Sequence, residues 1–298
     1  MTGNCLTGTW AVKEEFMPFE NINGIKVYYE SHGKGAEKGT ILLLHHGFGC
    51  VKTWEEIYPG LVDEGYRVIM YDRRGYGQSK KGPGFMEFYV SDRFRPESVE
   101  EMAVLMNFFG IDRFHVLGQC EGGVVGVDYA AKFPDQIRTL VIASTQCFSE
   151  IPMTEKNTRA FPKTFRDLEP ELKAKLIEWH GEDAETFYDQ FRQFGGAYGT
   201  DVFDLRPALS SVGCPSLVLF PDRSFIFDVE QGVAMYRQLS KGELAVLPGC
   251  GHNTYQYRPE DYVRIVLDFI HRHDEEGEEM TAEMIGTSCL AVKKPIRA

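Results

Sequence analysis

The stretch His115-Val-Leu-Gly-Gln-Cys120-Glu-Gly-Gly-Val124 places a short apolar strand, a Gly-x-Cys-x-Gly turn and the start of a helix in immediate succession. Gly118 and Gly122 remove the side chains that would collide where a strand folds sharply into a helix. Cys120, between them, is therefore expected to sit exposed on a strained turn, the geometry of a nucleophile elbow. The alternative interpretation, a buried cysteine beside three glycines by chance, is disfavoured by the flanking motifs.

Three further motifs surround this turn in order. The run Thr40-Ile-Leu-Leu-Leu-His-His-Gly-Phe-Gly49 reads as a buried strand that enters a glycine-rich loop. A second apolar strand, Tyr66 to Asp72, is followed by Arg73-Arg-Gly-Tyr-Gly-Gln-Ser79. A third strand begins at Glu243 and ends in a loop that carries His252.

In these four motifs, and in their order and spacing, residues Phe19 to His271 resemble the capped alpha/beta hydrolases. The most similar branch holds haloperoxidase-like esterases, proline iminopeptidases and carbon–carbon bond hydrolases. The resemblance implies an α/β fold with a mostly parallel eight-stranded sheet, helices on both faces and a helical cap inserted after strand 6. It also implies that His252 is the catalytic histidine and that the backbone amides of Phe48 and Glu121 form the oxyanion hole.

The alternation of strand and helix patterns is interrupted once, by a segment that lacks strand signals. We predict a core formed by residues 1–147 and 207–298, and a helical cap formed by residues 148–206. Residues 274–298 begin with acidic residues and lack periodicity, which predicts a mobile tail, with docking on a partner subunit as the alternative.

Cysteine at the elbow predicts acyl transfer through a thioester. A free thiol has a pKa of about 8.5, so Cys120 needs help to ionise. The start of the helix at Glu121 supplies a positive dipole end, and His252 supplies the base that becomes an imidazolium. The cysteine elbow of dienelactone hydrolase is similar, but that likeness is local.

The third member of the expected triad departs from the family pattern. After the strand that ends at Phe220 the chain reads Pro221-Asp222-Arg223-Ser224, so a serine occupies the usual acid position. We predict that Asp222 orients His252, with Asp228 and Glu150 as weaker substitutes. A missing acid is more tolerable for cysteine than for serine, because a thiol needs a smaller push to lose its proton.

Two features bear on the substrate. The Glu121 side chain is expected to be a solvated helix-start carboxylate; the alternative is that it is neutral, paired or bound to a cation. The aromatic residues of the cap are expected to pack mainly on its own helices, while some roof the pocket and favour an apolar or aromatic acyl group: Trp179, Phe187, Phe191, Phe194 and Tyr198.

The composition excludes several classes of protein. A net charge of −12 over 298 residues argues against nucleic acid or an anionic membrane as the main partner. No stretch of about 18 apolar residues and no signal-peptide pattern is present, which predicts a cytoplasmic protein. Seven cysteines, an odd number without zinc-site spacing, fit free thiols in a reducing compartment. No metal and no organic cofactor is implied.

Together these patterns predict an enzyme that hydrolyses a small ester, lactone or thioester through a cysteinyl acyl-enzyme. Cys120 is the nucleophile, His252 the base and then the acid, and Asp222 the orienting group. Two rivals stay open: an acyltransferase that uses the same acyl-enzyme, and a catalytically weak receptor or binding protein with the same fold. A homodimer is also left open.

Overall fold

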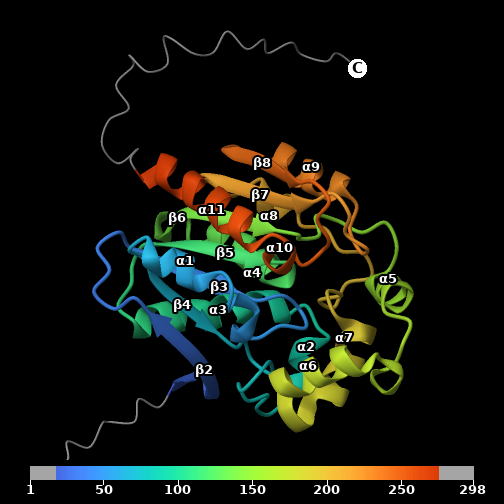
Figure 1. Cartoon of the computed structure of the whole chain (residues 1–298). Coiled ribbons are helices and arrows are strands. Elements are labelled where there is room, and N and C mark those ends of the chain that lie inside the picture. Colours follow the sequence, from blue (N-terminus) through green and yellow to red (C-terminus); the bar gives the residue numbers. More distant parts are fainter. Residues whose placement is uncertain (1–17, 275–298) are drawn as a thin grey trace, which may run out of the picture.

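The computed structural model describes residues 18–274, which fold around one eight-stranded sheet. Along the sheet the strands follow the order β1-β2-β4-β3-β5-β6-β7-β8 (Figure 1). The first two pairings are antiparallel and the other five are parallel, which confirms the predicted mostly parallel sheet. The strands are β1 (Phe19–Ile22), β2 (Ile25–His32), β3 (Thr40–Leu44), β4 (Arg67–Tyr71), β5 (Phe114–Gln119), β6 (Ile137–Ala143), β7 (Ser216–Pro221) and β8 (Gly242–Leu247).

Helices cover both faces of this sheet. On one face, α4 contacts β3, β5 and β6, and α9 contacts β7 and β8. On the other face, α1 contacts β4 and α11 contacts β6. The helices outside the segment between β6 and β7 are α1 (Tyr58–Asp63), α2 (Phe85–Tyr89), α3 (Phe94–Phe108), α4 (Glu121–Lys132), α9 (Val229–Gln238), α10 (Thr254–Tyr257) and α11 (Pro259–Asp274).

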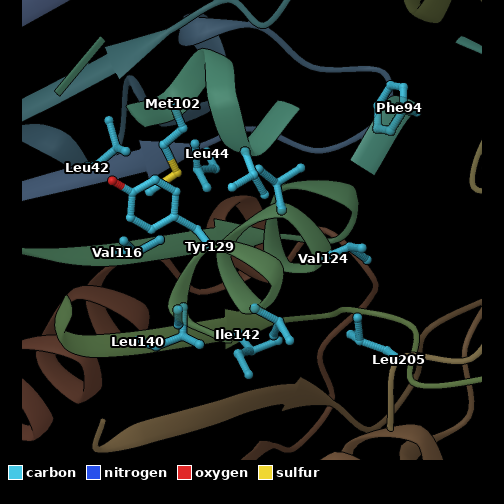
Figure 2. Close-up of a cluster of buried hydrophobic side chains, with 14 of the residues drawn as sticks. Leu42, Leu44, Phe94, Met102, Val116, Val124, Tyr129, Leu140, Ile142 and Leu205 are labelled. Atoms are coloured by element: carbon cyan, nitrogen blue, oxygen red, sulfur yellow. The ribbon is translucent and has the colours of Figure 1, made fainter. Parts of the chain in front are cut away.

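The apolar run at β3 shows why the sheet is covered on both sides. Side chains alternate along a strand, so Leu42 and Leu44 join one hydrophobic core while Ile41 and Leu43 join the other. Figure 2 shows α4 on the first of these faces, with its Val124 and Tyr129 packed among side chains from β3, β5 and β6. A continuous apolar strand is what a central parallel position requires.

The segment between β6 and β7 carries no strand and holds α5 (Met153–Ala160), α6 (Pro170–His180), α7 (Ala184–Phe194) and α8 (Arg206–Leu209). Helices α5 to α7 stand to one side of the sheet (Figure 1), which confirms a helical insertion after the sixth strand. An antiparallel bridge between Phe148 and Asp204 joins the two ends of this segment. The division at residues 148–206 stays a prediction, and the predicted tail lies outside the described residues from 275 onward.

Within residues 18–274, no helix combines the length and the apolar content that crossing a membrane requires.

Candidate active site

The predicted elbow forms at the carboxyl end of β5. Cys120 has φ 52° and ψ −114°, a region that L-residues rarely occupy, and it caps α4 directly after the strand. A side chain at Gly118 would lie 2.5 Å from the carbonyl oxygen of Gly122, and one at Gly122 would lie 2.2 Å from that of Leu44. Both contacts are with backbone and cannot yield, so glycine is required at each position.

Cys120 opens onto a cavity of about 280 Å³ that lies beneath the cap. His252, from the loop after β8, lines the same cavity. Both residues line this cavity, and among residues 18–274 no hydrogen bond joins the Cys120 sulfur to the His252 ring. Apolar and aromatic side chains form most of the wall, including Phe48, Val124, Met153, Phe161, Leu176, Trp179, Phe191, Tyr198 and Phe203.

The partner of the histidine is Ser224, and this corrects the prediction for Asp222. Ser224 Oγ lies 3.1 Å from His252 Nδ1. The Asp222 carboxylate instead accepts the backbone N–H of Cys250 at 2.9 Å. Hydrogen bonds from the backbone of Gly249 and Cys250 hold the pKa of Asp222 below its usual value. Asp222 therefore stabilises the loop before His252, because its short side chain is committed to that loop's backbone.

One oxyanion-hole prediction is also corrected. The N–H of Phe48 donates to His46 Nδ1 at 3.2 Å, so it is not available to a substrate. The amides that act on the Cys120 sulfur, and lower its pKa, are those of Glu121 and Gly47. Glu121 stays a predicted donor, whereas Gly47 takes the place predicted for Phe48, because the Phe48 N–H is already bonded to His46.

The resting cysteine and histidine are both neutral. Burial, followed by the negative charge of Glu121, raises the pKa of the Cys120 thiol to about 12. Burial lowers the pKa of His252 to about 4. At neutral pH the site therefore holds a thiol beside an uncharged imidazole, and not the thiolate–imidazolium pair that the sequence analysis anticipated.

Comparison with known proteins identifies the family. The family model described as the alpha/beta hydrolase fold matches residues 39–188. The chain belongs to the alpha/beta hydrolase fold family. It is therefore a hydrolase of that fold.

Individual relatives of this hydrolase are distant but cover most of its length. A proline iminopeptidase of Lactobacillus helveticus (strain DPC 4571) is 24% identical and aligns over 87% of this chain and 98% of its own. A 2-hydroxy-6-oxononadienedioate/2-hydroxy-6-oxononatrienedioate hydrolase of Paraburkholderia xenovorans (strain LB400) is 24% identical and aligns over 91% of this chain and 99% of its own. The enol-lactonase structure from Burkholderia xenovorans LB400 superposes with a TM-score of 0.69 at 20% identity, and the match covers 85% of this chain and 100% of that one. That structural likeness shows the fold alone.

A buried ion pair lies directly behind the elbow of this hydrolase. Glu121 Oε1 accepts a hydrogen bond of 2.8 Å from Arg73 Nη2 and another of 2.5 Å from the Tyr76 hydroxyl. The side chains of Glu121 and Arg73 are only 3% and 2% exposed. The expectation of a solvated carboxylate is therefore wrong, and the paired alternative is correct.

Arg73 also links the two loops that surround the cysteine. Its Nη2 has two hydrogens; one reaches Glu121 and the other reaches the carbonyl oxygen of His45 at 3.1 Å. The backbone N–H of Arg73 donates to His45 Nε2 at 3.1 Å. The loop that carries Gly47 is thus tied to the helix start that carries the Glu121 amide. Sequence analysis missed this role, because nothing in the run after β4 distinguishes Arg73 from the arginine that follows it.

Removal of Arg73 tests this pair. We expect Arg73→Met to lower the free energy of unfolding by about 3–5 kcal/mol, because the Glu121 carboxylate is left buried and unpaired. Adding Glu121→Met should recover much of the loss, since no charge is then buried. Urea denaturation followed by circular dichroism measures both changes.

The control for that experiment is Arg95→Met, which breaks a second ion pair, from Arg95 on α3 to Asp128 on α4 at 2.7 Å. The Arg95 and Asp128 side chains are 26% and 13% exposed, so loss of this pair should lower the free energy of unfolding less than loss of the Arg73–Glu121 pair. Equal losses for the two variants, or no recovery in the Arg73→Met, Glu121→Met double variant, would contradict the assignment of a costly buried charge.

The cap holds the Gly47 loop from the other side. The ring of Phe48 lies 4.1 Å from that of Phe191 and 5.1 Å from that of Tyr188, both on α7. His180, at the end of α6, contacts the carbonyl oxygen of Phe48 at 3.0 Å through Nε2 and accepts the N–H of Gly77 at 3.0 Å through Nδ1. These two bonds define the neutral Nε2–H form, in agreement with a pKa that burial lowers to about 4.

Among the predicted cap aromatics, Trp179, Phe191 and Tyr198 line the cavity. Phe187 instead contacts the rings of Tyr76 and His180, so it packs between cap and core. Within the described range no cluster of three or more His, Cys, Asp or Glu side chains is arranged to hold a metal ion.

The neutral thiol makes a prediction for chemical labelling. Iodoacetamide should modify Cys120 ahead of the other described cysteines, because those four are buried and Cys120 is partly exposed. Since the pKa of the thiol is raised to about 12, its thiolate fraction at pH 7 is about 10⁻⁵ and grows tenfold per pH unit. The labelling rate, measured by peptide mass spectrometry, should therefore rise steadily from about pH 6 to pH 9. A rate that is constant over this interval would instead indicate a preformed thiolate.

Proposed function

We propose that this hydrolase cleaves a small ester, lactone or thioester through an acyl-enzyme on Cys120. The observation that carries the proposal is the position of Cys120 at φ 52° in a cavity shared with His252, where the amides of Gly47 and Glu121 act on its sulfur. The family membership supports hydrolysis, and the structural neighbour named an enol-lactonase supports a lactone among the candidates.

The reaction follows from these positions. The Cys120 sulfur attacks the substrate carbonyl carbon while the thiol proton passes to His252 Nε2, once that nitrogen is free of a proton of its own. The carbonyl oxygen takes up the electron pair and is stabilised by the Gly47 and Glu121 amides, each typically worth about 3 kcal/mol. The carbonyl re-forms, the leaving group departs with its electron pair, and the proton held by His252 passes to it or to solvent, which leaves a thioester on Cys120 and a neutral His252. Water, deprotonated by His252, then attacks the thioester carbon; the carbon–sulfur bond breaks with its electron pair on sulfur, the proton on His252 returns to the Cys120 sulfur, and the acid is released.

The cavity supports an apolar or aromatic acyl group. Its wall is formed largely by aromatic side chains from the cap and the Gly47 loop, such as Phe161 and Phe191. One cationic side chain, Lys175, is part of the lining in the described residues, and its ammonium group lies 4.4 Å above the ring of Trp179. A volume of about 280 Å³ suits a small acyl group. The cytoplasmic location and the homodimer stay predictions.

An ester and thioester panel of varied acyl length tests the proposal. Intact mass spectrometry after rapid quenching should show the enzyme heavier by one acyl group, and peptide mapping should place that group on Cys120. Competing alcohols, thiols and amines then separate hydrolysis from acyl transfer, because a transferase would form their acyl products in preference to the acid. Turnover with the acyl group on any other residue would overturn the assignment.

A further inference from the structure

The hydroxyl of Ser224 has one hydrogen and two lone pairs, and its neighbours account for all three. The backbone N–H groups of Ile226 and Phe227 both donate to Ser224 Oγ, at 3.3 and 3.1 Å. With both lone pairs occupied, the hydrogen is the group left to face His252 Nδ1 at 3.1 Å. Nδ1 therefore accepts, and in a neutral imidazole the proton must then lie on Nε2.

We infer that Ser224 holds the resting His252 as its Nε2–H tautomer, and that this restricts the enzyme to acyl substrates with acidic leaving groups, namely thioesters and enol or aryl esters. This inference rests on the proposed acyl-enzyme on Cys120. Ser224 is a positioning residue, since it acts through the histidine and not on the substrate.

The remaining surroundings of the ring do not oppose this tautomer. The rings of Phe225 and Phe227 lie 5.8 and 5.4 Å from that of His252, and the Gln119 side chain donates to the His252 backbone carbonyl at 3.1 Å. His46, which lines the same cavity, is itself neutral because burial lowers its pKa well below the ordinary value. No carboxylate hydrogen-bonds the His252 ring anywhere in residues 18–274.

A triad aspartate has the opposite effect on its histidine. It accepts the Nδ1–H, leaves Nε2 free as a base and stabilises the imidazolium that forms. In this site Nε2 must first give up its proton by tautomer exchange, and the Ser224 hydroxyl must turn away from Nδ1. Among residues 18–274, no carboxylate is hydrogen-bonded to the ring to stabilise the imidazolium that follows.

The consequence appears when the tetrahedral intermediate collapses. Either the Cys120–carbon bond or the bond to the leaving group breaks, and the group with the lower pKa departs more readily. An alkoxide, whose conjugate acid has a pKa close to the 15.7 of water, needs a proton that a poorly populated imidazolium seldom supplies. A thiolate or phenolate, with pKa values of about 8.5 and 10, departs with its electron pair and needs no proton.

Nitrogen NMR on the full-length chain tests the tautomer directly. In ¹⁵N-labelled enzyme at neutral pH, two-bond proton–nitrogen correlations should show His252 protonated at Nε2, with the signals assigned by their absence in His252→Gln. Ser224→Asp should move the proton to Nδ1, because a carboxylate only accepts. A wild-type ring protonated at Nδ1 would overturn the inference, and this measurement needs neither turnover nor a folded Ser224→Asp variant.

Kinetics test the substrate class with one acyl group on three leaving groups: ethanol, phenol and ethanethiol. After correction for uncatalysed hydrolysis, we expect kcat/KM of the wild type for the thioester and the phenyl ester to exceed that for the ethyl ester by at least about 10²-fold. Ser224→Asp should narrow this ratio at least about tenfold, whereas Ser211→Asp, at an exposed serine away from the cavity, should leave it unchanged.

The outcomes separate the two proposals. Turnover through Cys120 with equal rates for all three leaving groups would overturn the leaving-group inference and leave the proposed function standing. If no acyl-enzyme forms with any substrate, the proposed function fails and the substrate-class inference fails with it. The NMR result then still decides the tautomer.

Discussion

Cys120→Ala should reduce kcat/KM by at least about 10⁴-fold, to the level of the uncatalysed reaction, because within residues 18–274 no other cysteine, serine or threonine lines the cavity. The side chain is partly buried and its methyl replacement fits the elbow, so the free energy of unfolding should change little. Initial rates on the best substrate of the ester and thioester panel measure the loss, and thermal denaturation confirms that the fold is intact.

Cys214→Ala is the matched control, since Cys214 is buried close to the start of β7 and does not line the cavity. It should retain wild-type kcat/KM. A loss of turnover in Cys120→Ala but not in Cys214→Ala would also exclude the second rival predicted from the sequence, a binding protein with the hydrolase fold. In such a protein, any apparent turnover would come from a contaminant. Equal activity of Cys120→Ala and wild type in pure preparations would favour that rival.

Cys120→Ser should lower kcat/KM by about 10³–10⁴-fold, even though the oxygen fits the elbow. A serine hydroxyl depends on a histidine held with Nε2 free, and the wrong tautomer in a serine enzyme costs about 10⁴ in kcat. The Ser224 hydroxyl at 3.1 Å from Nδ1 cannot supply the missing negative charge.

Adding Ser224→Asp to Cys120→Ser should raise kcat/KM at least about tenfold above that of Cys120→Ser alone. A carboxylate at this position can accept the N–H groups of Ile226 and Phe227 as well as the Nδ1–H. In the enzyme that keeps Cys120, Ser224→Asp should change kcat/KM for the best thioester by a factor at least about tenfold smaller than in Cys120→Ser. The reason is that acylation by a thiol demands less of the base. Purely additive changes across the two single variants and the double variant would contradict this coupling.

Sequence alone was sufficient for the sheet, the order of its elements, the helical insertion after β6 and the turn at Cys120. These features rest on local rules. Leu42 and Leu44 belong to an apolar run typical of a central parallel strand, and the glycines that flank Cys120 are dictated by steric contacts a few residues away. Such patterns can be recognised because the residues that interact are neighbours in the chain, or belong to repeating strand and helix units.

Only the tertiary structure decided the charge states and hydrogen-bond partners of the site. Glu121 is paired with Arg73, which lies 48 positions away, and Ser224 meets His252 across 28. The Asp222 carboxylate and the Phe48 amide, both predicted to act in catalysis, are occupied by the backbone of Cys250 and the ring of His46. Burial, which raises the pKa of Cys120 and lowers that of His252, is a property of the assembled core and cap, because desolvation depends on every element that closes over the cavity.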